Sequence, residues 1–485
     1  MKLLDPTLFR QQAYIGGAWC DADSGATFAV TNPADGALLG TAPSMGEVET
    51  RRAIGAAQAA LPAWRAKTGK ERGAILRRWY DLIQQNIDDL ALIMTLEQGK
   101  PLAEARGEIL YALSFVEWFS EEAKRVYGDV LPQTRSDQRL LAIKQPIGVC
   151  AAITAWNFPS ALVTRKVSPA LAAGCTVVLK PAELTPYSAF ALGELAQRAG
   201  VPDGVLNIVT GNPVEIGREL TSSRIVRKLT FTGSTATGRL LMQQCASNIK
   251  KLSLELGGNA PFIVFDDADI DAAIEGLLLS KFRNAGQTCI CANRVYVHEK
   301  IYSDFSERLA TRVQALEVGN GLDEGVMQGP LIDQRAIDKV ERLVADAIQK
   351  GAQVVLGAKR HQKGGLFYAP TVLGGITDQM DIATEEIFGP VVALSSFADE
   401  AAVIELANRS DSGLSAYFYS ENLARVWRVM EGLEYGIVGV NTGLVSNEVG
   451  PFGGIKESGV GREGSKYGIE EFMEVKYICL SGKMQ

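Results

Sequence analysis

The apolar residues of the chain recur with two different periods, which divide the sequence into a helical first quarter and a longer region of alternating strands and helices. Between residues 50 and 125, as in ETRRAIGAAQAALPAWRA, apolar positions repeat every three or four residues, which is typical of amphipathic helices. From about residue 139, short β-rich runs are separated by helical stretches; these runs include IGVCAAIT, TVVLK, VLNIVTG and RKLTFTG. This alternation predicts a parallel sheet whose strands are joined by right-handed helical crossovers.

A second alternation of strands and helices begins after KKLSLELGG, and it predicts a second α/β domain. Its apolar runs are APFIVF, RVYVHE, AQVVLG, PVVALSSF and GIVGVN. Ahead of the first strands, YGDVLPQTRSDQRLLAIKQ has Asp, Pro and Gly between two apolar arms and is predicted to form a protruding hairpin. The C-terminal EFMEVKYICLSG alternates like a strand without a partner nearby in sequence, so we expect it to pair across a subunit interface.

Length and composition are those of an ordinary globular protein of two or three domains. The 485 residues are 47% hydrophobic and 22% charged, which excludes a disordered, collagen-like or low-complexity chain. The net charge of −7 gives no basic excess, so we expect no nucleic-acid partner. Asp5 and Pro6 interrupt the segment that a signal peptide would need to be apolar, and no run of roughly 18 apolar residues occurs. We therefore expect a soluble cytoplasmic protein with no membrane association.

The chain is poor in histidine, and its cysteines are scattered. The two histidines, His298 and His361, could hardly supply a metal site or a nucleophile–histidine–acid triad, so no metal is expected. The cysteines have neither disulfide nor zinc spacing and are predicted to be reduced thiols. They stand at positions 20, 150, 175, 245, 289, 291 and 479.

Three residues could carry out covalent chemistry in such a chain. Cys289 lies in a glycine-bearing segment near a helix end, where a thiol can be activated as thiolate without histidine, although a buried structural cysteine is the alternative. Glu255 ends an apolar strand beside two glycines, and burial there would raise its pKa toward that of a general base. Asn157 follows the strand IGVCAAIT, and its amide could donate to a developing oxyanion.

Two other segments have the positions of nucleotide-binding residues. Gly233 and Ser234 lie where a strand passes into a helix, so free N–H groups there could attract phosphate. This segment is neither the GxGxxG fingerprint nor a P-loop, and a plain tight turn is an equal alternative. Lys180 and Glu183 follow the strand TVVLK, at the sheet edge where a ribose would be held, unless they form only a solvated ion pair.

Together these motifs resemble the aldehyde dehydrogenase superfamily. They occur in the family's order and span nearly the whole chain: WNFP (156–159), KPAE (180–183), GSTATG (233–238), ELGG (255–258), GQTC (286–289), EEIFGP (385–390) and PFGG (451–454). The bacterial succinate-semialdehyde dehydrogenase branch is further resembled by TRK (164–166), KFRNAGQTCICANR (281–294), SNEVGPFGGIKESG (446–459) and GREGSKYG (461–468). The resemblance implies an α/β aldehyde dehydrogenase-like fold. It would have a Rossmann-like cofactor domain (1–125 and 147–254), an α/β catalytic domain (255–471) and a small β oligomerisation element (126–146 and 472–485) of a homodimer or homotetramer.

The resemblance also implies a chemical role for the candidate residues. Cys289 would attack the aldehyde as thiolate, and the Asn157 side chain and the Cys289 N–H would hold the oxyanion of the thiohemiacetal. After hydride transfer to a nicotinamide, Glu255 would activate water to hydrolyse the thioester. Lys166 and Glu463 match a family pair linked to proton exit.

An NAD(P)+ cofactor is implied in the same way. Its contacts would come from Trp156 lining the cleft, Lys180 and Glu183 at the adenosine ribose, Gly233 and Ser234 at the pyrophosphate, and Glu386 and Phe388 at the nicotinamide ribose. We expect NAD+ to be preferred, because the Glu183 carboxylate would repel a 2′-phosphate. Some close relatives with a small residue at this position prefer NADP+, which is kept as the alternative.

The expected substrate is a short aldehyde with a distal anionic group. Arg165, Arg283 and Ser446 match the anion-binding residues of the semialdehyde branch and could clamp such a group, whereas either arginine alone could be a structural ion-pair residue. Succinate semialdehyde is the first choice, with glutarate semialdehyde and sulfolactaldehyde as alternatives. Ala155 and Gly450 depart from close relatives, where proline and alanine are usual, and Gly450 could leave extra room for a substrate.

Two other functions are compatible with parts of the pattern. A non-catalytic binding or structural member of the fold would be expected to lack Cys289, Glu255 or Asn157, and all three are present. A thiol hydrolase would not explain KPAE and EEIFGP. Cys291, two residues after Cys289, could form a reversible disulfide with it, although an inert neighbour is the expected role.

Overall fold

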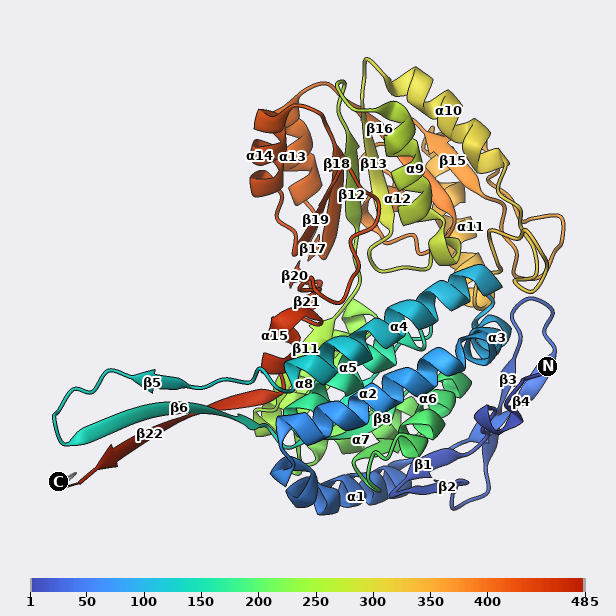
Figure 1. The fold of residues 1–485 in the computed structure, drawn as a ribbon. Coiled ribbons are helices and arrows are strands. Elements are labelled where there is room, and N and C mark those ends of the chain that lie inside the picture. Colours follow the sequence, from blue (N-terminus) through green and yellow to red (C-terminus); the bar gives the residue numbers. More distant parts are fainter. Residues whose placement is uncertain (1, 483–485) are drawn as a thin grey trace.

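The computed structural model describes residues 2–482 and shows two α/β lobes and a long β arm (Figure 1). The lower lobe in Figure 1 is built on an eight-stranded sheet and the upper lobe on a seven-stranded sheet. The arm is a three-stranded sheet that projects away from the lower lobe. Within residues 2–482, no helix is both long and apolar enough to cross a membrane.

Four helices form the first quarter of the chain, as the periodicity predicts. Thr68 begins the second of them with a capping box, in which its hydroxyl accepts from the Glu71 N–H and the Glu71 carboxylate accepts from the Thr68 N–H. The helices are α1 (Glu47–Ala66), α2 (Gly69–Gln85), α3 (Ile87–Gln98) and α4 (Leu102–Glu122). They are preceded by η1 (Pro6–Leu8), β1 (Ala13–Ile15), β2 (Ala18–Cys20), β3 (Thr27–Thr31) and β4 (Leu38–Pro43).

The first sheet has a parallel centre and antiparallel edges, in the order β2-β1-β9-β8-β7-β10-β11-β21. At one edge β1 pairs antiparallel with β9, and at the other β21 (Gly459–Val460) pairs antiparallel with β11. The parallel sheet predicted from the alternation is confirmed, but segments distant in sequence complete its edges. The parallel strands are β7 (Val149–Ile153), β8 (Thr176–Lys180), β9 (Leu206–Ile208), β10 (Val226–Thr232) and β11 (Lys251–Glu255).

Helices cover both faces of this sheet. Val177 and Leu179 of β8 belong to a core shared with α2 to α6, whereas Val178 belongs to a second core shared with α1, α7 and α8. Alternate residues of a strand point to opposite faces, so a strand buried on both faces is apolar throughout. The helices that follow the strands are α5 (Ala161–Ala173), α6 (Pro186–Arg198), α7 (Pro213–Ser222) and α8 (Thr235–Cys245), with η2 (Ala246–Asn248) after α8.

The second alternation forms the seven-stranded sheet, in the order β14-β15-β16-β13-β12-β18-β19. All of its pairings are parallel except the one between β14 and β15. Its strands are β12 (Ala260–Val264), β13 (Ala292–His298), β14 (Gln353–Leu356), β15 (Thr371–Gly374), β16 (Val391–Phe397), β18 (Ser415–Tyr419) and β19 (Ile437–Val440). Its helices are α9 (Ile270–Lys281), α10 (Tyr302–Gln314), α11 (Gln334–Gln349), α12 (Asp381–Thr384), α13 (Glu400–Asn408) and α14 (Leu423–Gly432). β15 and β18 lie in segments where the pattern predicts no strand.

The C-terminal strand lies in the arm and pairs within its own chain. β22 (Met473–Ser481) runs antiparallel to β6 (Gln138–Pro146) along its whole length. β6 also pairs with β5 (Asp129–Leu131), which confirms the predicted hairpin. β6, from a distant part of the sequence, thus supplies a partner for one edge of the C-terminal strand, and pairing of its other edge across a subunit interface stays a prediction. Between the lobes and the arm lie the short elements β17 (Ser412–Gly413), β20 (Ile455–Lys456) and α15 (Ser465–Glu470).

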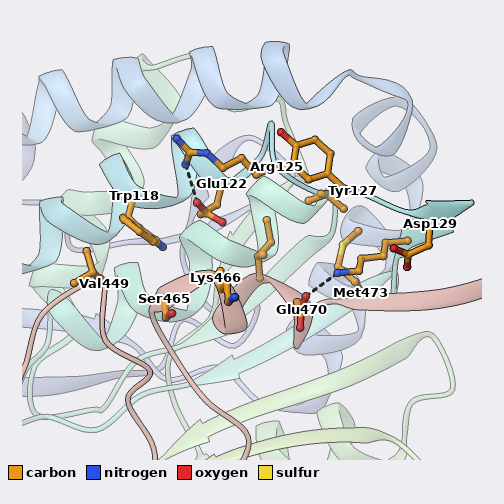
Figure 2. Close-up of a pocket in the computed structure, with 13 residues that line it drawn as sticks. Trp118, Glu122, Arg125, Tyr127, Asp129, Val449, Ser465, Lys466, Glu470 and Met473 are labelled. Carbon is orange, nitrogen blue, oxygen red and sulfur yellow. Dashed lines mark hydrogen bonds and ion pairs between the residues drawn. The ribbon is translucent and has the colours of Figure 1, made fainter. Parts of the chain in front are cut away.

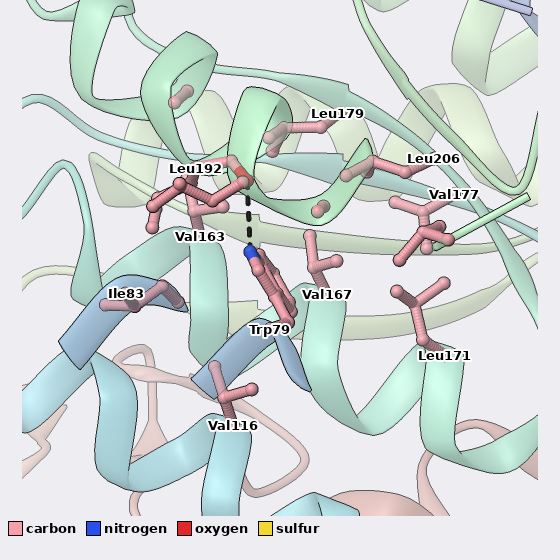
Figure 3. Close-up of a cluster of buried hydrophobic side chains, with 14 of the residues drawn as sticks. Trp79, Ile83, Val116, Val163, Val167, Leu171, Val177, Leu179, Leu192 and Leu206 are labelled. Carbon is pink, nitrogen blue, oxygen red and sulfur yellow. Dashed lines mark hydrogen bonds between the residues drawn. The ribbon is translucent and has the colours of Figure 1, made fainter. Parts of the chain in front are cut away.

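Trp79 of α2 anchors the helical layer to the first lobe. Its side chain is fully buried, and its indole N–H donates to the Leu192 carbonyl of α6 at 3.0 Å. Figure 3 shows the ring surrounded by aliphatic side chains, among them Val163 and Val167 of α5. One residue therefore joins three helices through packing and a hydrogen bond.

Trp79→Phe is expected to destabilise the fold, because it removes the indole donor and leaves a small cavity worth together about 1 to 3 kcal/mol. The midpoint of thermal unfolding, followed by intrinsic fluorescence or calorimetry, should fall by about 2 to 8 °C. Trp427→Phe is the matched control, because Trp427 is 55% exposed, and it should change the midpoint by no more than about 1 °C. Equal midpoints for the two variants would contradict the role given to Trp79.

Candidate active site

A cleft of about 460 Å³ lies at the carboxyl ends of β7, β10 and β11 and is lined by residues of both lobes. Its volume lies in the range of small-molecule sites, and the edge of a parallel sheet is where such sites form. Seven of the predicted site residues line this cleft, whereas Glu255, Lys166, Lys180, Glu183 and the three substrate candidates do not. The lining includes Trp156, Asn157, Gly233, Ser234, Gly257, Cys289, Glu386 and Phe388.

The main chain around Cys289 is closely packed against glycines of other motifs. A Cβ on Gly258 would lie 2.3 Å from the Cys289 carbonyl oxygen, so no larger residue fits there. Gly286, in the short η3 (Arg283–Gly286) before Cys289, has a φ of +77°, and a Cβ on it would lie 2.2 Å from the Gly389 carbonyl oxygen. The glycines of ELGG, GQTC and EEIFGP therefore share one role, which is to let three loops meet.

The Cys289 thiol is partly exposed and packs against an apolar cluster that includes Ile290 and Phe452. Burial raises the pKa of this thiol to about 12, although the positive charges of Arg165 and Arg283 act to lower it. The apolar surroundings thus favour the neutral thiol. A base must therefore remove the proton before the sulfur can attack.

Asn157 is oriented by the loop that carries Cys289. Its Nδ2 donates to the Gln287 carbonyl at 3.1 Å, which leaves the second N–H of the amide for another acceptor. The main-chain carbonyl of Asn157 accepts from Asn284 Nδ2 at 3.0 Å and from Lys100 Nζ at 2.8 Å. The amide is therefore fixed beside the nucleophile, at a position suited to an oxyanion donor.

Glu255, at the end of β11, has a buried carboxylate without a hydrogen-bond partner for either oxygen among the described residues. Burial raises the pKa of this carboxyl well above its ordinary value, and the nearby Glu463 raises it further. Gly453 borders the carboxylate, since a Cβ there would lie 2.9 Å from Oε1. The raised pKa expected from the sequence is confirmed in direction.

Glu463 pairs with two cations from consecutive positions of α5. Arg165 binds one carboxylate oxygen through Nε at 2.8 Å and Nη2 at 2.6 Å, and Lys166 binds the other oxygen. Burial alone would raise the pKa of Glu463, but Lys166 and Arg165 hold it at about 2. Arg165 also stacks on the ring of Phe452 at 4.1 Å. Arg165 is thus an ion-pair residue as well as a neighbour of the nucleophile.

Glu386 and Phe388 line the cleft beside Trp156. Glu386 accepts from the Gly258 N–H at 3.1 Å, and burial raises the pKa of its carboxyl to about 7. Phe388 has a φ of +54°, an uncommon conformation for an aromatic residue, and its ring meets that of Trp156 edge-on at 5.6 Å. Such local strain is found where a functional site fixes a side chain.

The residues expected at the distal part of the nucleotide lie at two strand ends. Lys180 is buried at the end of β8 and forms an ion pair with the half-exposed Glu183, so the pair is not fully solvated. Ser234 is the N-cap of α8, and its hydroxyl accepts from the Thr237 N–H at 3.3 Å. Both segments therefore have the locations that the alternation of strands and helices predicts.

The two remaining substrate candidates do not line the cleft but lie near the nucleophile. Arg283 is half-buried and stacks on Phe158 at 5.2 Å, and within residues 2–482 no carboxylate forms an ion pair with it. Ser446 is half-buried in the loop after β19, and the preceding Val445 packs against the apolar cluster that contacts Cys289. Arg283 therefore lies close to the thiol without an ion pair among the described residues.

Comparison with known proteins agrees with this arrangement. Residues 19–478 match the family model described as "Aldehyde dehydrogenase family". The chain belongs to the aldehyde dehydrogenase family. It is 63% identical to a glutarate-semialdehyde dehydrogenase of Pseudomonas aeruginosa and 63% identical to an NADP(+)-dependent succinate-semialdehyde dehydrogenase of Escherichia coli, in each case over 99% of this chain and 100% of the relative. A crystal structure described as an E. coli NADP-dependent enzyme, 62% identical, has a TM-score of 0.99 and covers 99% of this chain and 100% of its own.

The protein is therefore an NAD(P)+-dependent aldehyde dehydrogenase with the family's fold. A group of buried polar residues in this aldehyde dehydrogenase has no counterpart among the predicted site residues. Gln98, Lys100 and Glu108 come from the helical first quarter, yet they reach Asn284, Asn157 and the start of α5. The apolar periodicity does not identify these residues as part of a site. The only sequence signal is the polar run QGK, which lies between two apolar helical stretches.

A second cavity, of about 700 Å³, lies at the base of the arm, and its lining residues differ from those of the cleft (Figure 2). Its charged side chains are largely paired with one another, as Glu122 with Arg125 and Lys144 with Glu470. It contains no cysteine or other strong nucleophile among its lining residues. The chemistry of this aldehyde dehydrogenase therefore belongs to the smaller cleft.

The pKa of about 12 predicts how Cys289 reacts with a neutral alkylating agent. Because only the thiolate reacts, the rate of carbamidomethylation of Cys289 by iodoacetamide should rise about tenfold per pH unit between pH 7 and 9, without a plateau. Peptide mass spectrometry of samples quenched over time measures the rate for this residue. A plateau near pH 8 would show a thiolate already present, and Cys289→Ala identifies any label at other cysteines.

Proposed function

We propose that the protein oxidises a short aldehyde with a distal anionic group to the corresponding carboxylic acid, through a thioester on Cys289. The observation that carries this proposal is a cleft lined by the Cys289 thiol and the Asn157 amide, with the buried Glu255 carboxylate and two arginines close enough to act on the pKa of the thiol. A non-catalytic binding role does not need this set. A simple thiol hydrolase does not need the wall formed by Trp156, Glu386 and Phe388.

The residues of the cleft fit NAD(P)+. A Cβ on Gly257 would fill the space beside the Glu386 carboxylate, 3.2 Å from Oε2, so this glycine leaves room for a ligand there. Trp156, Glu386 and Phe388 would hold the nicotinamide end, Gly233 and Ser234 the pyrophosphate, and Lys180 with Glu183 the adenosine ribose. When bound, the nicotinamide supplies the acceptor for the hydride of the Cys289 adduct.

The first half of the reaction needs a base and an oxyanion donor. Glu255, in its ionised form, takes the thiol proton of Cys289, and the sulfur forms a bond to the aldehyde carbon. The carbonyl oxygen becomes an oxyanion, which accepts hydrogen bonds from the free N–H of the Asn157 amide and from the Cys289 main-chain N–H. Loss of hydride from this thiohemiacetal leaves a thioester.

Hydrolysis of the thioester uses the same two groups. Glu255 takes a proton from water, the hydroxide adds to the thioester carbon, and Asn157 again holds the oxyanion. The carbon–sulfur bond then breaks, which releases the carboxylic acid and the Cys289 sulfur. The proton taken from the thiol leaves Glu255 by way of Lys166 and Glu463 before the water is activated, and the proton taken from water returns to the Cys289 sulfur.

The anionic group of the substrate is proposed to bind Arg283, with Arg165 and Ser446 completing the site. Arg283 has no ion-pair partner within residues 2–482, whereas Arg165 is already bound to Glu463. The two semialdehyde dehydrogenases to which the chain is similar are named for substrates that share a terminal carboxylate. Succinate semialdehyde remains the first choice. Glutarate semialdehyde, with one more methylene, and sulfolactaldehyde, with a sulfonate, are the alternatives.

The assembly and the compartment are proposed as well. The arm exposes Val130, Val475, Tyr477 and Leu480, which supports a role for β5, β6 and β22 in a homodimer or homotetramer. The division into a cofactor domain, a catalytic domain and this oligomerisation element follows the two sheets and the arm. All seven cysteines are free thiols, which supports the reducing cytoplasm. Cys291, buried with its thiol near two main-chain carbonyls, is proposed to be an inert neighbour of Cys289.

A substrate panel tests the proposed function. NADH or NADPH formation should be efficient with succinate or glutarate semialdehyde or sulfolactaldehyde, weak with butanal, and absent in Cys289→Ala. Arg283→Ala should lower kcat/KM for the anionic aldehydes about 10- to 100-fold, because it removes a charge-assisted hydrogen bond. Its effect on butanal should stay within about threefold.

The two arginines are expected to behave differently in this panel. Arg165→Ala frees Glu463 from one of its two cations and should reduce turnover of every aldehyde, whereas the exposed Arg312→Ala should change nothing. If butanal matches the anionic aldehydes in the wild type, the protein has no anion selectivity. If Arg283→Ala loses nothing selectively, the anion is bound elsewhere.

Glu183 is expected to set the cofactor preference towards NAD+. Glu183→Ser removes the carboxylate that would oppose a 2′-phosphate and frees Lys180 to meet one, so the ratio of kcat/KM for NAD+ to that for NADP+ should fall about tenfold or more. Glu183→Gln removes the charge but keeps an oxygen that can accept from the ribose. Its ratio of kcat/KM for NAD+ to that for NADP+ should therefore lie between the ratios of the wild type and Glu183→Ser. A wild type that strongly prefers NADP+ would contradict this prediction.

A further inference from the structure

The helical first quarter contains a buried ion pair that the proposed chemistry does not use. Lys100 and Glu108 lie on either side of the start of α4, each side chain is 1% exposed, and their charged atoms are 2.5 Å apart. Removing two charges from water is costly, and a buried pair of this kind is often no more stable than an apolar one. Its contacts, rather than its contribution to stability, indicate what it does.

The pair holds the Asn157 segment at both ends. Lys100 Nζ donates to the Asn157 carbonyl at 2.8 Å and lies 4.2 Å from the ring of Phe158. Glu108 Oε1 accepts from the main-chain N–H groups of Ser160 at 2.9 Å and Ala161 at 3.2 Å. The turn between β7 and α5 therefore cannot shift without breaking bonds to a buried charge.

The neighbouring residues connect this turn to the loop of the nucleophile. Gln98 Nε2 donates to Asn284 Oδ1 at 2.8 Å, and Glu104 accepts from the Asn284 N–H at 2.8 Å. Asn284 Nδ2 in turn donates to the Asn157 carbonyl at 3.0 Å. That carbonyl thus accepts one hydrogen bond from the helical layer and one from the Cys289 loop, so a single network fixes their separation.

We propose that Lys100 and Glu108 are positioning residues that hold the Asn157 main chain so that its side-chain amide meets the oxyanion formed on Cys289. This inference rests on the proposed function, because it assumes the oxyanion role of Asn157. A displacement of about 1 Å at a reacting group can cost about 100-fold in rate. Neither residue lines the cleft, so aldehyde and cofactor binding should not depend on the pair.

The test compares turnover with binding in Lys100→Met, which keeps the length of the side chain and removes its charge. We expect kcat for succinate semialdehyde to fall about 10- to 100-fold. The dissociation constant for NAD+, from quenching of tryptophan fluorescence, should stay within about threefold. Alkylation of Cys289 by iodoacetamide should also be unchanged, because that reaction forms no oxyanion. Lys228→Met is the matched control, since Lys228 is also buried and ion-paired, with Glu471 near the arm, and it should keep kcat within about twofold.

The variant Asn157→Ala distinguishes positioning from a general loss of structure. If Lys100 acts through the Asn157 amide, adding Lys100→Met to Asn157→Ala should lower kcat by no more than about threefold further. The same loss in both backgrounds, or no loss in Lys100→Met alone, would overturn the proposal. If Lys100→Met does not fold, Glu108→Gln is measured in both backgrounds with the same criteria, because the amide oxygen can still accept from Ser160 and Ala161. A wild type without aldehyde oxidation would instead overturn the proposed function. If the wild type oxidises the aldehyde, Asn157→Ala lowers kcat and Lys100→Met leaves kcat unchanged, only this inference is overturned.

Discussion

The site depends on the contact between the main chain of Cys289 and Gly258. Gly258 lies between β11, the last parallel strand of the first sheet, and β12 in the middle of the second sheet. Because a Cβ there would lie 2.3 Å from the Cys289 carbonyl oxygen, only glycine lets the loop of the nucleophile rest on this connection. Glu255, three residues earlier, then lies close enough to act on the pKa of the thiol. Backbone packing, and not an attraction between side chains, thus brings the thiol and this carboxylate together.

The charges around this contact are arranged so that a negative charge can form. Arg165 and Lys166 together oppose the single carboxylate of Glu463, which leaves one net positive charge beside the buried and unpartnered Glu255. Burial favours the neutral forms of Glu255 and of the thiol, since an isolated buried charge is costly. The excess positive charge lowers the cost of ionising either group. A proton can therefore leave the site without an imidazole, which agrees with a chain that has two histidines.

Much of this could be predicted because local sequence determines it. The apolar runs predict the central strands of both sheets, and polar residues that follow those runs, such as Asn157 and Ser234, line the cleft because strand ends meet there. The edges of the first sheet, the partner of β22 and the Arg165–Glu463 pair depend on residues far apart in sequence. The pKa of Cys289 could not be predicted for the same reason, since the apolar residues around it include Phe452 from a distant loop.

Arg165 and Arg283 both match anion-binding residues in sequence, but only Arg165 forms an ion pair among the described residues. An anionic substrate group at Arg165 would have to share a guanidinium whose Nε and Nη2 already bind Glu463, and breaking a buried pair typically costs about 3 to 5 kcal/mol. Arg283 has no such partner among the described residues, so an anion there would not have to displace a carboxylate. In the proposed function, selection of an anionic aldehyde would therefore depend mainly on Arg283, while Arg165 acts on the charge of Glu463 and, through it, on Glu255.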